Sequence, residues 1–262
     1  MNLNLQNYTA LVCGSSQGIG RAAATELAAM GARVVLLARS EEALKSTCSS
    51  LPSPNGQQHH YLAADFSNPA QVASVVSTFV NAGNPIHILV NNTGGPPGGP
   101  IVNATTEAFL NTFNQHLICN HLIAQAVLPG MKEVGFGRII NIISTSVKQP
   151  LKGLGVSNTI RAAVANWSKT LSIKVAPLGI TVNNVSPGAT ATQRLSSIIE
   201  NKSQKQNHTI DEVEQEMLSE IPAGRFGKPE EIAAAVAFLA SPAAAYINGI
   251  NIPVDGGRTG CL

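Results

Sequence analysis

The sequence predicts an α/β fold in which one doubly wound sheet of seven parallel strands carries helices on both faces. Short apolar runs alternate with runs of helical periodicity along all 262 residues, the pattern of strand-helix units that build parallel sheets. No internal repeat and no shift in composition divides the chain. Residues 1–262 are therefore expected to form a single domain, a size that α/β folds reach.

The turn after the first expected strand is the most informative local feature. Apolar residues at Thr9–Val12 predict a buried strand, an amphipathic run at Arg21–Met30 predicts a helix, and glycines occupy positions 14, 18 and 20 between them. Glycine lets the backbone turn sharply and approach a phosphate, and the free N–H groups of a helix's first turn attract an anion. The loop therefore suggests a nucleotide-binding site, although glycines between a strand and a helix also form ordinary turns.

The second expected strand adds a preference for one nucleotide. The run Arg33–Ala38 has the apolar character of a strand buried on both faces, and Arg39 follows it. In dinucleotide-binding folds an acidic residue near this point binds the ribose 2′-hydroxyl, whereas an arginine accommodates a 2′-phosphate. Arg39 thus favours NADP(H); the alternative is a surface arginine at the end of a strand.

The remaining elements continue the alternation. Further strands are expected at 59–64, 86–90, 138–143, 180–185 and 250–254, and helices from Glu41 and at 69–81, 105–128, 157–175 and 229–239. The polar stretch at about 190–220 is expected to form a helical lid over the substrate. Right-handed crossovers place the carboxyl ends of all parallel strands at one edge of the sheet. The residues expected to meet there are Gly14, Arg39, Asp65, Asn91, Ser144 and Pro187.

The composition argues against several classes of function. Only 12% of residues are charged and 44% are hydrophobic, which favours an oligomer whose subunits cover part of the surface. The net charge of +2 is spread thinly, so no nucleic-acid partner is expected. The four cysteines lie at no metal-ligand or disulfide spacing, so we expect no metal and a reducing, cytoplasmic location. The amino-terminal residues lack a signal-peptide pattern, and Pro242 and Asn248 interrupt the uncharged run Ile232–Val254, so no membrane span is expected.

Several sequence motifs follow the expected strands. The loop Gly14–Gly20 fits TGxxxGIG with Cys13 in place of threonine, and Asn91–Gly94 fits NNAG with threonine in place of alanine. The run Gly137–Asn141 leads to Ser144 as in GRIVNISS, and later motifs lie at Ser186–Gly188, Gly224–Ile232 and Val254–Gly257. Together they resemble the short-chain dehydrogenase/reductase family of Rossmann-fold enzymes, and within it the 3-oxoacyl-acyl-carrier-protein reductases. The resemblance covers essentially the whole chain, and its carboxyl-terminal motifs imply a homotetramer.

The resemblance also implies which residues serve the cofactor. Asp65 matches the acid that contacts adenine, the segment around Pro187 matches the motif that lies against the nicotinamide, and Ser144 matches the catalytic serine. The full NADP(H) site implied in this way consists of Gly14, Ser16, Gln17, Gly18, Ile19, Gly20, Arg39, Asp65, Phe66, Asn92, Arg161, Pro187, Gly188, Thr190 and Thr192.

The catalytic motif departs from that of the family. The family's proton-donating tyrosine and its lysine, in YxxxK, correspond to Ser157 and Arg161, and its helix-borne asparagine corresponds to His116. Serine is a much weaker acid than tyrosine, whereas Arg161 keeps a positive charge that can hold the nicotinamide ribose. We hypothesise that His116, through a water, supplies the proton while Ser144 orients the substrate carbonyl. In the alternative interpretation His116 only fills the place of the asparagine.

The sequence therefore favours an NADPH-dependent oxidoreductase that reduces a ketone, of 3-oxoacyl type or similar, to an alcohol with atypical proton donation. Two alternatives stay open. One is an NADP(H)-binding, catalytically weak protein that serves as a scaffold or regulatory subunit, and the other is a lyase or isomerase without net redox chemistry. The partner is expected to be a small-molecule carbonyl substrate, bound between residues 93–100, 145–156 and 190–220 in a pocket without a fixed charged anchor.

Overall fold

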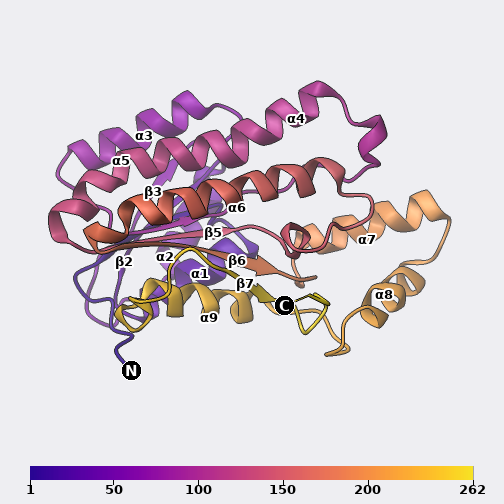
Figure 1. Ribbon diagram of the computed structural model, residues 1–262. Helices are drawn as coiled ribbons and strands as arrows, with labels where there is room; N and C mark the ends of the chain where they lie inside the picture. Colours follow the sequence, from indigo (N-terminus) through magenta and orange to yellow (C-terminus); the bar gives the residue numbers. More distant parts are fainter. Residues whose placement is uncertain (262) are drawn as a thin grey trace.

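The computed structural model describes residues 1–261, which form one seven-stranded parallel sheet covered by helices (Figure 1). The strand order is β3-β2-β1-β4-β5-β6-β7, so the predicted doubly wound sheet is confirmed. The strands are β1 (Thr9–Cys13), β2 (Arg33–Ala38), β3 (His60–Ala63), β4 (Ile88–Asn91), β5 (Gly137–Ile142), β6 (Ile180–Pro187) and β7 (Asn251–Val254).

Helices connect the strands and extend the carboxyl-terminal half. The long helices are α1 (Gly18–Ala29), α2 (Glu41–Ser50), α3 (Pro69–Asn81), α4 (Thr106–Phe113), α5 (Cys119–Val134), α6 (Gly155–Val175), α7 (Gln193–Gln206), α8 (Ile210–Ser219) and α9 (Pro229–Ala240). Shorter turns are η1 (Ile101–Asn103), η2 (Asn114–Ile118), η3 (Thr145–Val147), η4 (Ala176–Leu178) and η5 (Pro242–Ala244). Within residues 1–261 no helix combines the length and the apolar character that crossing a membrane requires.

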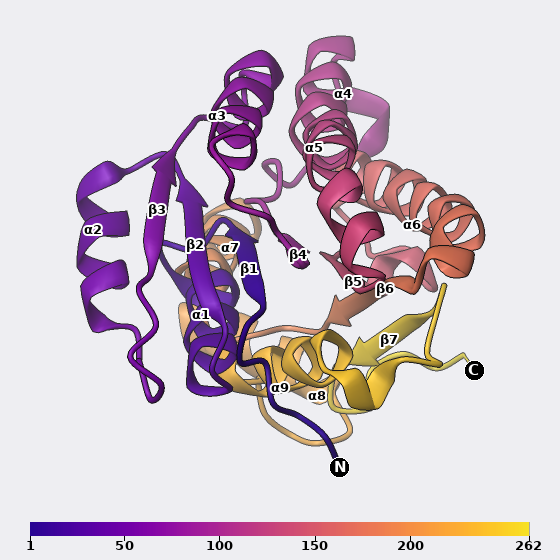
Figure 2. The same cartoon turned by 90° about the vertical axis from the view of Figure 1, so that its left-hand side faces the viewer.

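In the strands β1 to β6, residues that point to opposite faces of the sheet pack into two separate cores. Ala10 and Val12 of β1 pack on the face covered by α1 and α9, whereas Leu11 and Cys13 pack on the face covered by α3, α5 and the end of α6. Figure 2 shows these two helical layers on opposite sides of the sheet. Both faces are buried, which explains why β1 and β2 are largely continuous apolar runs rather than alternating ones.

The strand order reverses beside β1, and this reversal positions the site. The chain runs outward from β1 to β2 and β3 and then returns to β4 on the other side of β1. In open parallel sheets, ligands bind in the crevice at the carboxyl ends of the strands next to such a switch point. Helices α7 and α8, drawn in orange, lie at one end of the molecule in Figure 1.

A row of asparagines crosses four neighbouring strands, and all but the last of them, Asn251, are buried. Asn91, Asn141, Asn184 and Asn251 are paired in register from β4 to β7. Each side-chain amide donates to the next carbonyl oxygen, over 2.8 Å from Asn91 to Asn141, 2.9 Å from Asn141 to Asn184 and 2.7 Å from Asn184 to Asn251. A buried amide left without a partner costs about 1–3 kcal/mol, so any slip of register is penalised at several positions together.

The expected helix at 105–128 is interrupted in the structure. It divides into α4, the π-helical turn η2 and α5, with His116 in the middle of η2. A π-turn adds one residue to the helical turn and is frequent at functional sites. The sequence pattern of apolar residues did not reveal it, because α4 and α5 continue on either side.

Candidate functional site

The loop between β1 and α1 is closely packed against Asn92, which follows β4. Gly14 has a φ of +58°, and a Cβ atom added there would lie 2.6 Å from the backbone oxygen of Asn92. A Cβ on Gly20 would lie 2.2 Å from the backbone oxygen of Gly14. The Asn92 amide donates to the backbone oxygens of Cys13 and Gly14, each over 3.3 Å. These glycines are therefore required by the fold of the loop.

The start of α1 is built to receive an anion. Its N-cap residue, Gln17, makes no side-chain capping hydrogen bond, and the first turn of the helix contains no acidic residue. The free N–H groups and the helix dipole then favour a negatively charged ligand at this point. The Ser15 hydroxyl accepts a hydrogen bond from the Leu37 N–H over 3.0 Å, which ties the loop to β2.

The predicted adenosine-side residues lie at the same edge of the sheet. Arg39 is exposed directly after β2, and Asp65 follows β3, where its carboxylate accepts a hydrogen bond from the Ser67 N–H over 2.9 Å. Phe66 is buried, and its carbonyl accepts a hydrogen bond from the Cys119 thiol over 3.4 Å.

The segment after β6 carries the predicted nicotinamide-side residues. A Cβ on Gly188 would lie 2.7 Å from the Asp255 Cα, so the chain passes close to the end of β7. The Thr190 hydroxyl donates to the Gly188 carbonyl over 3.0 Å, and the Thr192 hydroxyl donates to the Thr190 carbonyl over 3.2 Å. Thr192 is also the N-cap of α7.

Ser144 lies two residues beyond the end of β5 and keeps its proton available. Its Oγ accepts a hydrogen bond from the Ser146 N–H over 3.1 Å, which leaves the O–H free to donate. In the described part of the chain, buried polar atoms without a partner include Ser146 Oγ and Ser186 Oγ at the same edge. Buried polar groups are rarely left unpaired, so this edge is suited to a polar ligand.

Arg161 and Ser157 lie one turn apart on α6. The Arg161 guanidinium donates to the backbone oxygen of Ile142 over 2.6 Å and to that of Thr93 over 3.4 Å, so it bridges the ends of β5 and β4. Burial, followed by the charge of Arg194, lowers the pKa of Arg161 to about 10, and the group still carries its charge at neutral pH. Ser157 is partly buried on the same face.

His116 is buried in η2 with only 2% of its surface exposed. Its Nδ1 is hydrogen-bonded to the Thr93 hydroxyl, and its Nε2 has no partner among the described residues. Burial and then the charge of Arg161 hold the pKa of His116 well below its ordinary value. The imidazole is therefore neutral at pH 7, which argues against an imidazolium proton donor and leaves a neutral hydrogen-bonding group.

Arg194 was not anticipated as a site residue. It lies in the first turn of α7, and its guanidinium donates to the Pro96 carbonyl over 2.5 Å. A Cβ on Gly95 would lie 3.1 Å from the Arg194 Nη2 atom and 3.9 Å from that of Arg161. The expectation of a pocket without a charged anchor was therefore wrong. The only sequence clue was an arginine two residues after the capping Thr192.

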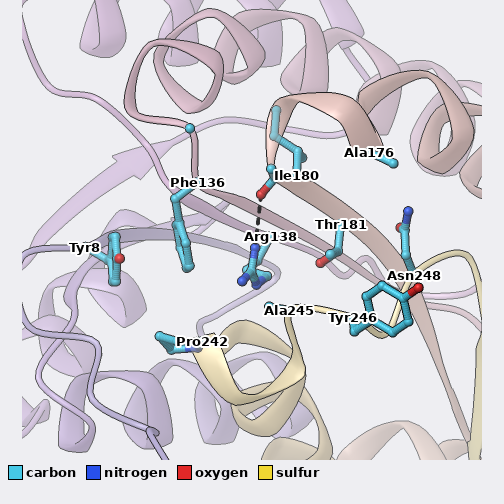
Figure 3. Close-up of a pocket in the computed structure, with 12 residues that line it drawn as sticks. Tyr8, Phe136, Arg138, Ala176, Ile180, Thr181, Pro242, Ala245, Tyr246 and Asn248 are labelled. Carbon is cyan, nitrogen blue, oxygen red and sulfur yellow. Dashed lines mark hydrogen bonds between the residues drawn. The ribbon is translucent and has the colours of Figure 1, made fainter.

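A cavity of about 630 Å³ lies away from these residues, at the amino ends of β5 and β6 (Figure 3). Its lining includes Tyr8, Phe136 and Arg138. The Arg138 guanidinium lies 4.1 Å from the Phe136 ring centroid and already donates to the backbone oxygens of Gly137, Gly179 and Ser241. This cavity contains none of the predicted site residues, so we assign the functional site to the carboxyl edge of the sheet.

Comparison with known proteins identifies the class. Residues 14–259 match the family model described as enoyl-(acyl carrier protein) reductase. The chain belongs to the short-chain dehydrogenase/reductase family, as its motifs and fold predict.

Within this family the chain is similar to 3-oxoacyl-acyl-carrier-protein reductases. It is 35% identical to the 3-oxoacyl-[acyl-carrier-protein] reductase FabG of Vibrio cholerae, over 97% of this chain and 98% of the relative. It is 34% identical to the NADPH-dependent reductase BacG of Bacillus subtilis, with the same coverage of 97% and 98%. The solved structure of L-sorbose reductase from Gluconobacter frateurii, complexed with NADPH and L-sorbose, matches with a TM-score of 0.93 at 32% identity and covers 100% of both chains.

Proposed function

We propose that this protein is an NADPH-dependent oxidoreductase that reduces a ketone to an alcohol. The observation that carries the proposal is the convergence of the glycine cradle, Ser144 and Arg161 at one edge of the sheet. The names of the similar proteins support it, since they describe NADPH-dependent and 3-oxoacyl reductases.

The residues of the cradle fit NADP(H). The backbone positions that a Cβ would fill, at Gly14 and Gly20, allow a pyrophosphate to approach the uncapped start of α1. Arg39 suits the 2′-phosphate that distinguishes NADPH from NADH. When bound, NADPH supplies the hydride for the reaction.

The chain's own groups act on the substrate oxygen. The free Ser144 O–H donates a hydrogen bond to the carbonyl and stabilises the alkoxide as negative charge develops. Arg161 adds a fixed positive charge beside it, held in place by the backbone oxygens of Thr93 and Ile142. Ser157 is too weak an acid and too short to replace a tyrosine.

Proton delivery falls to His116 in a neutral form. Because Nδ1 is engaged by Thr93, the unpartnered Nε2 is the atom that would position a water. This water would give one proton to the alkoxide, and the hydroxide left behind would take a proton from bulk solvent, so that His116 stays neutral throughout. This refines the hypothesis of an active His116, since an imidazolium is disfavoured there.

The second candidate is an NADP(H)-binding protein with little turnover, which acts as a scaffold or regulatory subunit. The specific observation in its favour is that the positions of the family's tyrosine and lysine hold Ser157 and Arg161. The expected homotetramer, the cytoplasmic location and the role of residues 190–220 as a lid stay part of the proposal. Exposed Leu110, Val134 and Ile173 on α4, α5 and α6 are compatible with subunit contacts.

The experiment that tests the proposal combines binding and turnover. NADPH binding is followed by fluorescence titration, and NADPH oxidation is followed by absorbance with a panel of 3-oxoacyl thioesters, simple ketones and quinones. The proposal requires binding, together with oxidation by at least one ketone that Ser144→Ala reduces at least a hundredfold. Binding without oxidation by any ketone supports the scaffold, and absence of binding contradicts both candidates.

A further inference from the structure

Two arginines meet at the loop that follows β4. Arg161 reaches this loop from α6 and donates to the Thr93 carbonyl, and Arg194 reaches it from α7 and donates to the Pro96 carbonyl. Their Nη2 atoms lie 3.9 Å and 3.1 Å from the position that a Cβ on Gly95 would occupy. Since both distances are measured from one point, the two nitrogens lie within about 7 Å of each other.

Among residues 1–261, no acidic side chain forms an ion pair with either arginine. The ion pairs in the described part of the chain are Lys202–Glu216, Arg225–Glu231 and Arg258–Glu220, and none involves Arg161 or Arg194. Burial is the main reason why the pKa of Arg161 is lowered, and the charge of Arg194 lowers it further, which is the direction expected of two neighbouring cations. Two adjacent cations beside a ligand crevice are stabilised best when the ligand brings a negative charge.

The separation suits a carboxylate that bridges the two groups. Charge-assisted hydrogen bonds from a guanidinium to a carboxylate are about 2.8 Å long, and two of them plus the width of the carboxylate span such a gap. Each guanidinium has five N–H donors and spends only one or two on backbone oxygens, so donors remain for a ligand. Gly95 contributes by its lack of a side chain, because a Cβ there would press on Arg194.

We propose that Arg161 and Arg194 form a carboxylate subsite beside Ser144, and that the preferred substrate is a ketone that carries a carboxylate. The inference rests on the proposed ketone reduction and specifies its substrate class. A carboxylate held by the two arginines fixes one end of the substrate and turns its carbonyl toward the Ser144 hydroxyl. Arg194 is then a specificity-determining residue on the lid, and Arg161 serves both substrate and cofactor.

The test compares oxo acids with their neutral esters. Holoenzyme with NADPH is assayed on 2-oxobutanoate, 4-oxopentanoate and 5-oxohexanoate and on the methyl ester of each. For at least one pair, kcat/KM for the acid is expected to exceed that for the ester at least tenfold. Arg194→Met is expected to lower kcat/KM for that acid at least tenfold and to leave the ester within twofold.

A matched control removes a charge elsewhere. Arg33 is exposed at the amino end of β2, at the opposite edge of the sheet, and Arg33→Met is expected to leave both activities unchanged. The NADPH dissociation constant of Arg194→Met is measured in parallel. If Arg194→Met weakens NADPH binding and lowers acid and ester activity by the same factor, the arginine serves the cofactor and the proposal is overturned.

A binding measurement separates this proposal from the proposed function. Calorimetric titration of the NADP⁺ complex with 4-oxopentanoate and with its methyl ester reports the subsite even if no ketone is reduced. Binding of the acid that is lost in Arg194→Met supports the subsite, whatever the turnover. Equal binding of acid and ester in the unmodified protein contradicts it, even if ketones are reduced.

Discussion

Restoring the family's acid pair tests the catalytic reasoning directly. In Ser157→Tyr/Arg161→Lys, a phenol and an ammonium occupy positions one turn apart on the same face of α6. The tyrosine hydroxyl extends further from the backbone than the Ser157 hydroxyl, by the length of its aromatic ring. Its pKa of about 10 is lowered by a neighbouring cation. The variant gains a side chain that is itself a general acid, whereas in the present site the proton is proposed to come from a water positioned by His116.

The expected increase in kcat follows from the rate factor that a general acid contributes. General acid catalysis contributes about 10² to 10⁴ in rate, or about 3 to 5 kcal/mol of barrier. Replacing Arg161 removes the bridge between the Ile142 and Thr93 carbonyls, which costs part of this gain. We therefore expect kcat to rise by about 10² on a neutral ketone such as methyl 4-oxopentanoate.

The assay is NADPH oxidation under saturating cofactor, with NADPH affinity and thermal unfolding measured for each protein. Ser157→Phe/Arg161→Lys is the matched control, because it adds the same ring without the hydroxyl. A folded tyrosine variant that binds NADPH normally but turns over no faster than the phenylalanine variant would refute the reasoning. The proton would then come from a route that does not need an acid at position 157.

Three further predictions concern the cofactor cradle and the buried histidine. Gly14→Ala places a Cβ 2.6 Å from the Asn92 oxygen at a φ of +58°, so NADPH affinity is expected to fall at least tenfold in a fluorescence titration, with Gly56→Ala as the control. Arg39→Asp removes the partner of a 2′-phosphate and is expected to raise the NADPH dissociation constant by about 10- to 150-fold while NADH binding is retained. Because the pKa of His116 is lowered by folding, the unfolded chain binds its proton more readily. The free energy of unfolding should fall as pH drops below about 6.5, by up to about 1.4 kcal/mol per pH unit. Urea titrations of His116→Asn should lack the decrease in stability that His116 causes.

The sequence predicted the strands and helices whose bounds depend on residues close together in the chain. The strand Arg33–Ala38 and the helix Pro69–Asn81 have the bounds expected from sequence. The helix begins at a proline preceded by Asn68, whose side chain accepts a hydrogen bond from the Gln71 N–H over 3.1 Å. Such capping depends on residues three positions apart, and a sequence displays it directly.

The features that escaped prediction depend on residues far apart in the chain. Arg194 reaches the carbonyl of Pro96 across 98 positions of sequence, so nothing near Arg194 indicated a site. The π-turn around His116 is defined by backbone geometry rather than by a change in periodicity. The roles of Ser144, Ser157, Arg161 and His116 stay predictions, since their placement at one edge is compatible with turnover and with cofactor binding alone.

The asparagine row gives the site a fixed spacing between its loops, which the loop residues themselves do not determine. Asn91 directly precedes Asn92, Asn141 lies three residues before Ser144, and Asn184 lies three residues before Pro187. The row fixes the register of these strands. The hydrogen bonds inside the sheet therefore determine where the loops after β4, β5 and β6 begin relative to one another. Loop residues that face the substrate are then free to diverge without altering the spacing between catalytic and cofactor groups. In this chain, specificity is accordingly open to change through Arg194 and its neighbours, while the framework that places the reacting groups stays constant.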